Sequence, residues 1–135
     1  MISSDEQRRM QRKHIFIVNG DPHFLELLRE LFQDERYNVT TTNFVPETFD
    51  QIEALKPELI IIDLVIGEQA GWELLAQLQD DAVTAKIPVL VTSTNDEYLH
   101  IATSNQERYG VDAYVSKPMD IEALLDHVHG LVGQP

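Results

Sequence analysis

The sequence predicts an α/β protein in which helices cover both faces of a parallel sheet. Three observations support this fold class. Strand-like and helix-like segments alternate five times along the 135 residues. The strand-like stretches are short and almost continuously apolar, as expected for strands that are buried on both faces. Strands and helices that alternate at this spacing form parallel sheets with helical connections.

The first strand and the first helix are predicted at residues 14–18 and about 22–34. HIFIV is nearly all apolar, and apolar residues then recur at the spacing of one helix face. The Asn-Gly pair between them is ordinarily a hairpin signal, but no second strand follows it. Asp21 is a suitable N-cap and Pro22 suits the first helical turn, so this turn leads directly into a helix.

The remaining elements follow from the same kinds of signal. β-Branched or apolar runs indicate strands, and prolines, glycines and apolar periodicity indicate helices. We predict strands at residues 37–42, 59–63, 89–93 and 111–116. We predict helices from Pro46 to Lys56, after the loop VIGEQAG, from about 96 to 108, and from 121 to 132.

Polar side chains gather where the predicted strands end, which is the edge at which α/β sheets bind ligands. A charged residue that ends the run LIII is costly unless it is solvated or paired. Taken singly, each polar residue could be a turn cap, a satisfied hydroxyl or a surface lysine. Together they indicate a chemical site, and its members are Asn19, Gly20, Asp21, Asp63, Ser93, Thr94, Lys117 and Pro118.

These segments resemble the receiver domain of two-component response regulators. The resemblance is carried by IFIVNGDP, LIIIDL, Gly71, IPVLVTS and YVSKP. Its most specific parts are the aspartate that ends the third strand, the hydroxyl thirty positions later, and the Lys-Pro that closes the fifth strand. It covers residues 14–132, which leaves 1–13 as an N-terminal extension and 133–135 as a tail. It implies a CheY-like, flavodoxin-like (βα)5 fold with strand order 2-1-3-4-5.

The resemblance also implies roles for individual residues. Asp63 would be the phosphoacceptor, and Lys117 would pair first with its carboxylate and then with the phosphate. Ser93 would hydrogen-bond the phosphoryl group, and Tyr114 would change position with it, although Tyr114 also fits an ordinary half-buried strand aromatic. The switching face would comprise the helix at 96–108, the fifth strand and the last helix. The chain would then be a signalling domain, with self-catalysed phosphorylation at most. Trp72 is interpreted as packing at the core or the pocket rim.

Receiver domains use Mg²⁺, and here the match to its ligands is incomplete. Asp63 and the backbone carbonyl of Val65 match two ligands. Asn19 and Gly20 stand where the family has adjacent acids, and Asp21 is the remaining candidate ligand. Because Gly20 offers no side chain, we expect weak Mg²⁺ binding, lower by about an order of magnitude or more. Alternatively, Gly20 gives the turn a positive φ.

Composition excludes several classes of function. The net charge of −13 argues against direct binding to nucleic acid or to anionic membranes. No apolar run approaches the ~20 residues of a membrane span, there is no cysteine, and no secretory h-region begins the sequence. We therefore expect a cytoplasmic protein. Four basic residues crowd the N-terminal extension: Arg8, Arg9, Arg12 and Lys13. We interpret it as a solvated arm, and the alternative is an arm that docks on an acidic body or on a partner.

The resemblance implies a sensor histidine kinase or a phosphotransfer protein as partner, and a possible homodimer through the switching face. An alternative is a pseudo-receiver, a phosphorylation-independent interaction or dimerisation module in which Asp63 and Lys117 form a structural pair. An unrelated flavodoxin-like enzyme or nucleotide binder is disfavoured, because no P-loop or GxGxxG follows the first strand.

Overall fold

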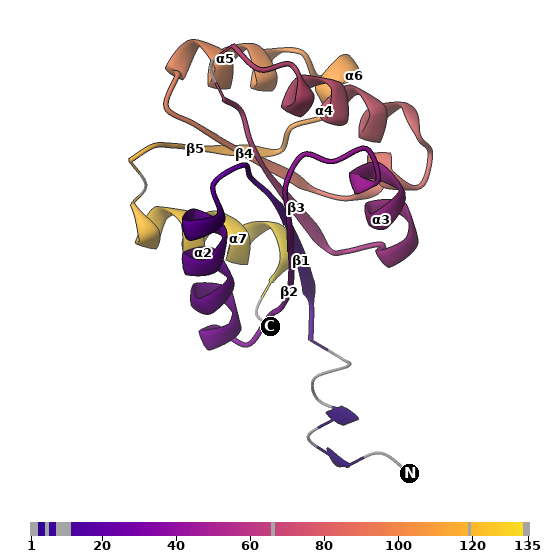
Figure 1. Cartoon of the computed structure of the whole chain (residues 1–135), viewed down its shortest axis with the longest axis vertical. Helices are drawn as coiled ribbons and strands as arrows, with labels where there is room; N and C mark the ends of the chain where they lie inside the picture. The colour runs from indigo at the N-terminus through magenta and orange to yellow at the C-terminus, as the bar shows by residue number, and fades with distance from the viewer. Residues whose placement is uncertain (1–2, 5, 8–11, 66, 119, 134–135) are drawn as a thin grey trace.

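A computed structural model describes residues 3–4, 6–7, 12–65, 67–118 and 120–133. All five strands lie in one parallel sheet, in the order β2-β1-β3-β4-β5 (Figure 1). The strands are β1 (His14–Val18), β2 (Asn38–Thr42), β3 (Leu59–Asp63), β4 (Val89–Ser93) and β5 (Ala113–Ser116). The predicted fold class and strand order are thus confirmed.

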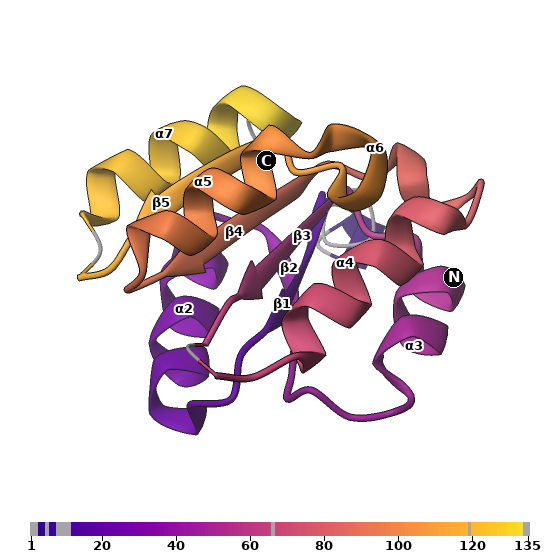
Figure 2. The ribbon, with the colours of Figure 1, turned by 90° about the horizontal axis from the view of Figure 1, so that it is seen from above.

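Helices cover both faces of this sheet, as Figure 2 shows from above. The helices are α2 (Pro22–Asp34), α3 (Thr48–Leu55), α4 (Ala70–Asp80), α5 (Asp96–Ser104), α6 (Gln106–Tyr109) and α7 (Ile121–Val132). A short 3₁₀ helix, η1 (Thr84–Lys86), precedes β4. Helices α2 and α7 pack on one face, and α3, α4 and α5 pack on the other. None of the helices in the described part of the chain is long and apolar enough to span a membrane.

The core consists of two layers, one on each side of the sheet. Along β1, Ile15 and Ile17 pack toward α2 and α7, whereas Phe16 and Val18 pack toward α3, α4 and α5. All four side chains are at most 1% exposed. Because successive strand residues point to opposite faces, burial on both faces requires the continuous apolar runs seen in the sequence. Each such buried side chain contributes about 1.5–3 kcal/mol.

The single helix predicted at 96–108 is wrong, because the chain forms two helices there. Asn105 separates α5 from α6 with a φ of −117° and a ψ of 76°, outside the helical region. Its side chain caps α6 by accepting a hydrogen bond from the amide of Arg108 at 3.2 Å. The side chain of Gln106 donates to the carbonyl of Val111 at 2.7 Å, which ties α6 to the approach of β5.

Several other predicted boundaries shift by one or two residues. Helix α4 begins at Ala70, inside the stretch VIGEQAG that was predicted as a loop, and α3 ends at Leu55 rather than at Lys56. Helix α3 begins at Thr48 rather than at Pro46, because the Thr48 hydroxyl accepts from the amide of Val45 at 3.2 Å and so organises a turn first. Strand β5 begins at Ala113 rather than at residue 111, and β2 begins at Asn38 rather than at residue 37.

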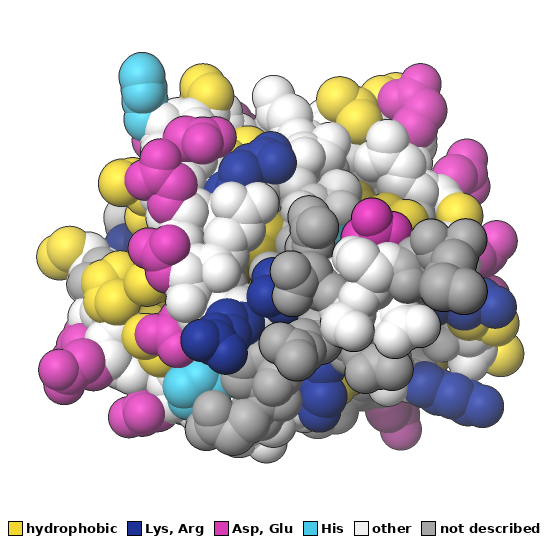
Figure 3. All heavy atoms as spheres, turned by 90° about the horizontal axis from the view of Figure 1, so that it is seen from below, with side chains coloured by type: hydrophobic (Ala, Val, Ile, Leu, Met, Phe, Trp, Pro, Cys, Tyr) yellow, Lys and Arg dark blue, Asp and Glu magenta, His cyan; other side chains and the backbone are white. Residues whose placement is uncertain are grey.

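Lys13, the last residue of the N-terminal extension, contacts the body of the protein. The ammonium of Lys13 donates a hydrogen bond to the carbonyl of Val132, at the C-terminal end of α7. A cation is favoured there because the last carbonyls of a helix carry partial negative charge. Arg8 and Arg9 lie outside the described residues. Seen from below, Lys and Arg side chains are interspersed with Asp and Glu side chains (Figure 3).

Candidate functional site

Asp63 is the last residue of β3 and pairs with Lys117, which follows β5. The Lys117 ammonium lies 2.7 Å from Oδ1 of Asp63. The side chain of Lys117 is 20% exposed and that of Asp63 is 7% exposed. A carboxylate this deeply buried needs a cation or hydrogen-bond donors, and the lysine supplies the charge. The site therefore contains an ion pair that is formed in the unphosphorylated chain.

The ring of Phe24 also contacts the ammonium of Lys117. The Lys117 ammonium lies 4.6 Å from the centre of this ring, within the range of a cation–π interaction. Phe24 lies in the first turn of α2, whose N-cap is Asp21. The turn after β1 therefore places an aromatic ring against the lysine, which sequence reasoning missed.

Thr92 also contacts Asp63, and sequence reasoning missed it as well. Its hydroxyl donates to Oδ1 of Asp63 at 2.7 Å. The two residues are register partners in the parallel pairing of β3 with β4. The available signal was a threonine within VLVTS, one residue before Ser93, where a buried hydroxyl needs an acceptor.

Ser93 contacts the loop after β3 rather than the Asp63 side chain. Its hydroxyl donates to the carbonyl of Leu64 at 2.7 Å and accepts from the amide of Asn95 at 3.1 Å. Its carbonyl accepts from the amide of Lys117 at 2.9 Å. Ser93 therefore connects the loop after Asp63, the start of α5 and Lys117.

A hollow opens beside the ion pair. Its volume is about 260 Å³. Its walls are formed by the ends of β3 and β4 and by the residue after β5, and the lining residues are Asp63, Leu64, Val65, Thr94 and Lys117. Sequence reasoning grouped Thr94 with the strand-end residues, and it contributes to this wall. The predicted acceptor and the predicted lysine thus share one accessible hollow.

The close packing of α4 fixes the position of the loop after Asp63. A Cβ at Gly71 would lie 2.9 Å from Leu64 Cδ2 and 3.3 Å from the carbonyl oxygen of Asp63. Only glycine permits this approach without a shift of its neighbours. The glycine at this position thus has a direct steric role in shaping the site.

Trp72 is partly buried and packs against the core, one of the two placements that the sequence indicated. Its ring lies 5.4 Å from that of Tyr98 and 5.0 Å from that of Tyr109. The hydroxyl of Tyr98 accepts a hydrogen bond from the amide of Gly67 at 3.2 Å, in the loop that follows Asp63. The single tryptophan is therefore connected to the loop after Asp63 through one intervening residue, Tyr98.

Tyr114 projects from β5 toward the surface and is 50% exposed. Its neighbour in the strand, Val115, is buried in the core. The next residue, Ser116, donates to the carboxylate of Asp96 at 3.2 Å and so connects β5 with α5. The exposed ring is available for contacts with another molecule, and its role as a switch remains a prediction.

The turn after β1 provides few free oxygen ligands for a metal ion. The amide oxygen of Asn19 accepts from the amide of Asp21 at 2.8 Å. The Asp21 carboxylate accepts from the amides of His23 and Phe24 at 3.0 and 3.4 Å, and so caps α2. Among the described residues, no group of three or more His, Cys, Asp or Glu side chains could hold a metal ion. The residues present therefore do not fit a carboxylate-rich Mg²⁺ site.

The other expected ligand, the carbonyl of Val65, accepts a hydrogen bond from the amide of Glu68 at 3.1 Å. Gly20 does not have a positive φ, so the alternative explanation of this glycine is wrong. A Cβ at Gly20 would meet only the side-chain oxygen of Asn43, at an ordinary contact distance of 3.7 Å. The backbone would accept a side chain at this position, and the missing carboxylate is a property of the sequence alone.

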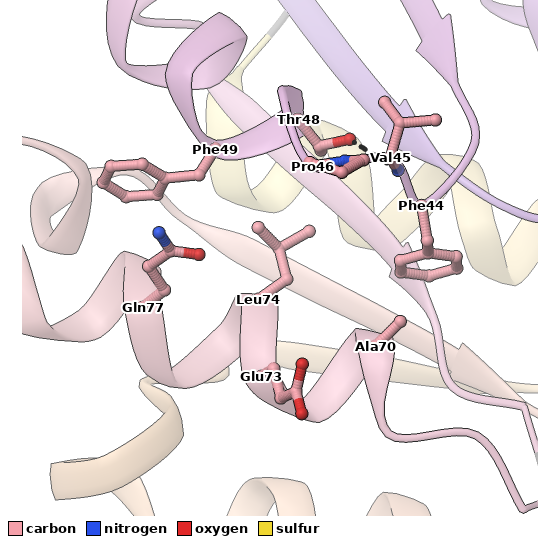
Figure 4. Close-up of a pocket in the computed structure, with 9 residues that line it drawn as sticks. All are labelled: Phe44, Val45, Pro46, Thr48, Phe49, Ala70, Glu73, Leu74 and Gln77. Atoms are coloured by element: carbon pink, nitrogen blue, oxygen red, sulfur yellow. Dashed lines mark hydrogen bonds between the residues drawn. The ribbon is translucent and has the colours of Figure 1, made fainter.

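A separate hydrophobic pocket lies between α3 and α4, as Figure 4 shows. Leu74 projects from α4 toward the segment that begins α3, with aromatic rings on either side (Figure 4). The lining residues are Phe44, Val45, Pro46, Thr48, Phe49, Ala70, Glu73, Leu74 and Gln77. Asp63 and Lys117 are not among them, so this pocket is distinct from the hollow at the strand ends.

Comparisons with known proteins agree with this arrangement. The family model described as the response regulator receiver domain matches residues 15–129. The transcriptional regulatory protein GlrR of Escherichia coli (strain K12) is 28% identical over 121 residues, which cover 90% of this chain and 26% of that protein. The polar-differentiation response regulator DivK of Brucella anthropi is 26% identical over 124 residues, covering 90% of this chain and 97% of that protein. The chain spans about a quarter of the length of the first curated relatives it matches.

Solved structures show the same fold. The chemotaxis response regulator CheY4 of Vibrio cholerae has a TM-score of 0.77 at 18% identity, covering 90% of this chain and 99% of that one. The N-terminal domain of the nisin resistance regulator NsrR has a TM-score of 0.75 at 23% identity, covering 90% and 99%. Because the family model matches most of the chain, this protein belongs to the response regulator receiver domains, the signalling modules of two-component systems.

Proposed function

We propose that this receiver domain accepts a phosphoryl group on Asp63 from a histidine kinase or a phosphotransfer protein. The supporting observation is the geometry of one carboxylate: Asp63 is paired with Lys117 at 2.7 Å and lines an open hollow. Receiver domains interact with such donors, which makes a phosphorylated histidine the natural substrate. We further propose that residues 14–132 form the receiver unit, with 1–13 as an extension and 133–135 as a tail.

The proposed step is a direct displacement at phosphorus. An oxygen of the Asp63 carboxylate forms a bond to phosphorus, while the bond from phosphorus to the donor breaks. The electron pair of that bond leaves with the donor, either on an imidazole nitrogen or on the carboxylate released from an acyl phosphate. The ammonium of Lys117 stabilises the charge that accumulates on the phosphoryl oxygens. In this step the chain catalyses its own modification.

Receiver domains generally bind Mg²⁺ at an acidic pocket, and we propose that this chain binds it weakly. The proposal rests on Gly20, which has no side chain to act as a ligand where the family has an acid. In addition, Oδ1 of Asn19, Oδ1 of Asp21 and the carbonyl oxygen of Val65 each already accept a hydrogen bond from a backbone amide. When bound, Mg²⁺ would offset negative charge near Asp63. Both capping hydrogen bonds are accepted by Oδ1 of Asp21, so Oδ2 is the atom of this carboxylate that would serve as a metal ligand.

We propose that phosphorylation is read out by the face formed by α5, β5 and α7. Ser93 would turn from the carbonyl of Leu64 toward the phosphoryl group, which would release the loop after Asp63 and the start of α5. This face exposes apolar side chains from each of its elements, namely Ile101, Tyr114 and Ile121, which are 42%, 50% and 44% exposed. A homodimer through this face would cover them.

Intact mass spectrometry after incubation with acetyl phosphate and Mg²⁺ tests the proposal. We expect one phosphoryl adduct on the wild-type chain and none on Asp63→Asn, which preserves size but is a poor nucleophile. The fluorescence of Trp72 should change on saturation with beryllofluoride, since Trp72 contacts Tyr98 and Tyr98 binds the loop after Asp63. An unmodified wild-type chain at every Mg²⁺ concentration would favour the pseudo-receiver instead.

A further inference from the structure

We infer that Thr92 is a positioning residue for phosphoryl transfer, which fixes the carboxylate of Asp63 so that Oδ2 is the oxygen presented to the donor. The inference rests on the proposed function, and it adds a residue outside the set that the sequence indicated. It also distinguishes two oxygens that are chemically equivalent in a free carboxylate.

The contacts of Asp63 are distributed unequally between its two oxygens. The hydroxyl of Thr92 donates to Oδ1 at 2.7 Å, and the ammonium of Lys117 lies 2.7 Å from the same oxygen. No hydrogen bond to Oδ2 is found among the residues that the structure describes. The side chain also lines the hollow beside the strand ends. Two donors therefore hold one oxygen, and the other is left for reaction.

Lys117 alone would not select an oxygen. Its ammonium is a compact charge on a flexible stem and can contact either oxygen, or both, as the carboxylate rotates. Its side chain also remains 20% exposed. A lysine of this kind supplies charge but little orientation.

Thr92 supplies the orientation because its own position is fixed by the sheet. It is 1% exposed, and its backbone is the register partner of Asp63 in the β3–β4 ladder. A β-branched side chain has restricted rotation about χ1, so the hydroxyl has few other positions available. Side chains carried by rigid strands hold reacting groups more accurately than side chains on loops.

The two donors would then act differently during the reaction. When Oδ2 bonds to phosphorus, Oδ1 becomes the carbonyl oxygen of the acyl phosphate, and the negative charge moves onto the phosphoryl oxygens. The neutral hydroxyl of Thr92 can still donate to Oδ1. The ammonium of Lys117 would move from Oδ1 of Asp63 to the negatively charged phosphoryl oxygens. Thr92 thus keeps the acyl group oriented in both the starting state and the product.

The test compares three variants by the rate of labelling with acetyl phosphate. Thr92→Val removes the hydroxyl at nearly constant volume, and we expect a rate at saturating donor about tenfold lower, as for a lost hydrogen bond to a charged group. The donor concentration at half-saturation should change little. Thr92→Ser retains the hydroxyl and should recover the rate to within about twofold.

Thr84→Val is the matched control. Thr84 is also 1% exposed, and its hydroxyl donates to the carbonyl of Leu78 at 2.6 Å, away from the hollow. This variant loses a buried hydrogen bond of the same kind, and its labelling rate should stay at the wild-type value. Equal losses in Thr84→Val and Thr92→Val would assign the effect to stability and would overturn the inference.

The ¹³C resonance of the Asp63 carboxyl group provides a readout that does not depend on phosphorylation. We expect it to move in Thr92→Val and to return in Thr92→Ser. An unmoved resonance, or a Thr92→Val chain labelled at the wild-type rate, would overturn the inference alone. If the resonance differs between the wild-type chain and Thr92→Val but the wild-type chain takes no label, the proposed function is refuted. Thr92 would then orient the Asp63 carboxylate without taking part in a phosphoryl transfer.

Discussion

The ion pair between Asp63 and Lys117 should be strongly coupled, and a double-mutant cycle can measure it. The two variants are Asp63→Asn, which retains an acceptor for the Thr92 hydroxyl, and Lys117→Met, which retains the length of the side chain. Each one removes a charge from a site where the opposite charge then remains without its partner. The double variant removes both charges together.

The expected magnitude follows from the geometry of the pair. Two unit charges 2.7 Å apart attract by about 6 kcal/mol at an effective dielectric constant of 20. Desolvation of both groups offsets much of this attraction, and removing one member of a buried pair costs about 3–5 kcal/mol. Because Lys117 is 20% exposed, we expect the lower end, about 3 kcal/mol for Lys117→Met, and a coupling energy of about 2 kcal/mol.

Urea denaturation of the four chains at pH 7 measures this coupling as a difference between free energies of unfolding. The double variant should be more stable than the sum of the two single losses implies. A coupling energy below about 0.5 kcal/mol, the value of an exposed pair, would refute the conclusion that the pair is buried and standing.

Two further perturbations test the turn after β1 and the pH dependence of stability. Gly20→Asp should raise the affinity for Mg²⁺ about tenfold or more, as measured by titration of the fluorescence of the single tryptophan. Gly130→Asp, which adds the same charge to α7, should leave the affinity unchanged. Equal Mg²⁺ affinities of the two variants would contradict the conclusion that Gly20 stands at a ligand position. The carboxyl of Asp81, hydrogen-bonded to Glu53, raises the pKa of Glu53, so this contact stabilises at low pH and its contribution is lost as the pH rises through the raised value. Burial lowers the pKa of His14 despite the charge of Glu58. The neutral imidazole therefore stabilises the fold at high pH, and this contribution to the free energy of unfolding is lost as the pH falls below about 6.5. Urea denaturation between pH 4 and 8 should show Glu53→Gln and His14→Gln changing the pH profile in opposite directions, and parallel profiles would contradict both assignments.

Local sequence patterns were sufficient to predict most of the fold. Strands β3 and β4 lie where their apolar runs predicted them, because burial on both faces favours continuous runs of apolar residues. Helix α2 begins at Pro22 because Asp21 caps it, and both residues act within a few positions of chain. The division between α5 and α6 could not be predicted in this way. It depends on the Gln106 side chain reaching Val111 beyond the helix, a contact that only the folded chain defines.

The site was predictable to the extent that a family motif described it. Asp63, Ser93 and Lys117 came from such a motif, and the structure brings Asp63 and Lys117 into contact. Thr92 and Phe24 came from neither motif nor periodicity. Thr92 meets Asp63 through the register of two strands that are almost thirty residues apart. Phe24, in the first turn of α2, meets Lys117, which follows β5, because the start of that helix and the end of that strand lie at the same edge of the sheet. Both contacts follow from topology and from no local pattern.

The central claim, that Asp63 is the phosphoacceptor, is tested most directly by locating the phosphoryl group. The wild-type chain is incubated with acetyl phosphate and Mg²⁺, digested under conditions that preserve acyl phosphates, and sequenced by tandem mass spectrometry. We predict a single acid- and base-labile phosphoryl group on Asp63. A phosphoryl group on any other residue, or none at any Mg²⁺ concentration, would contradict this account.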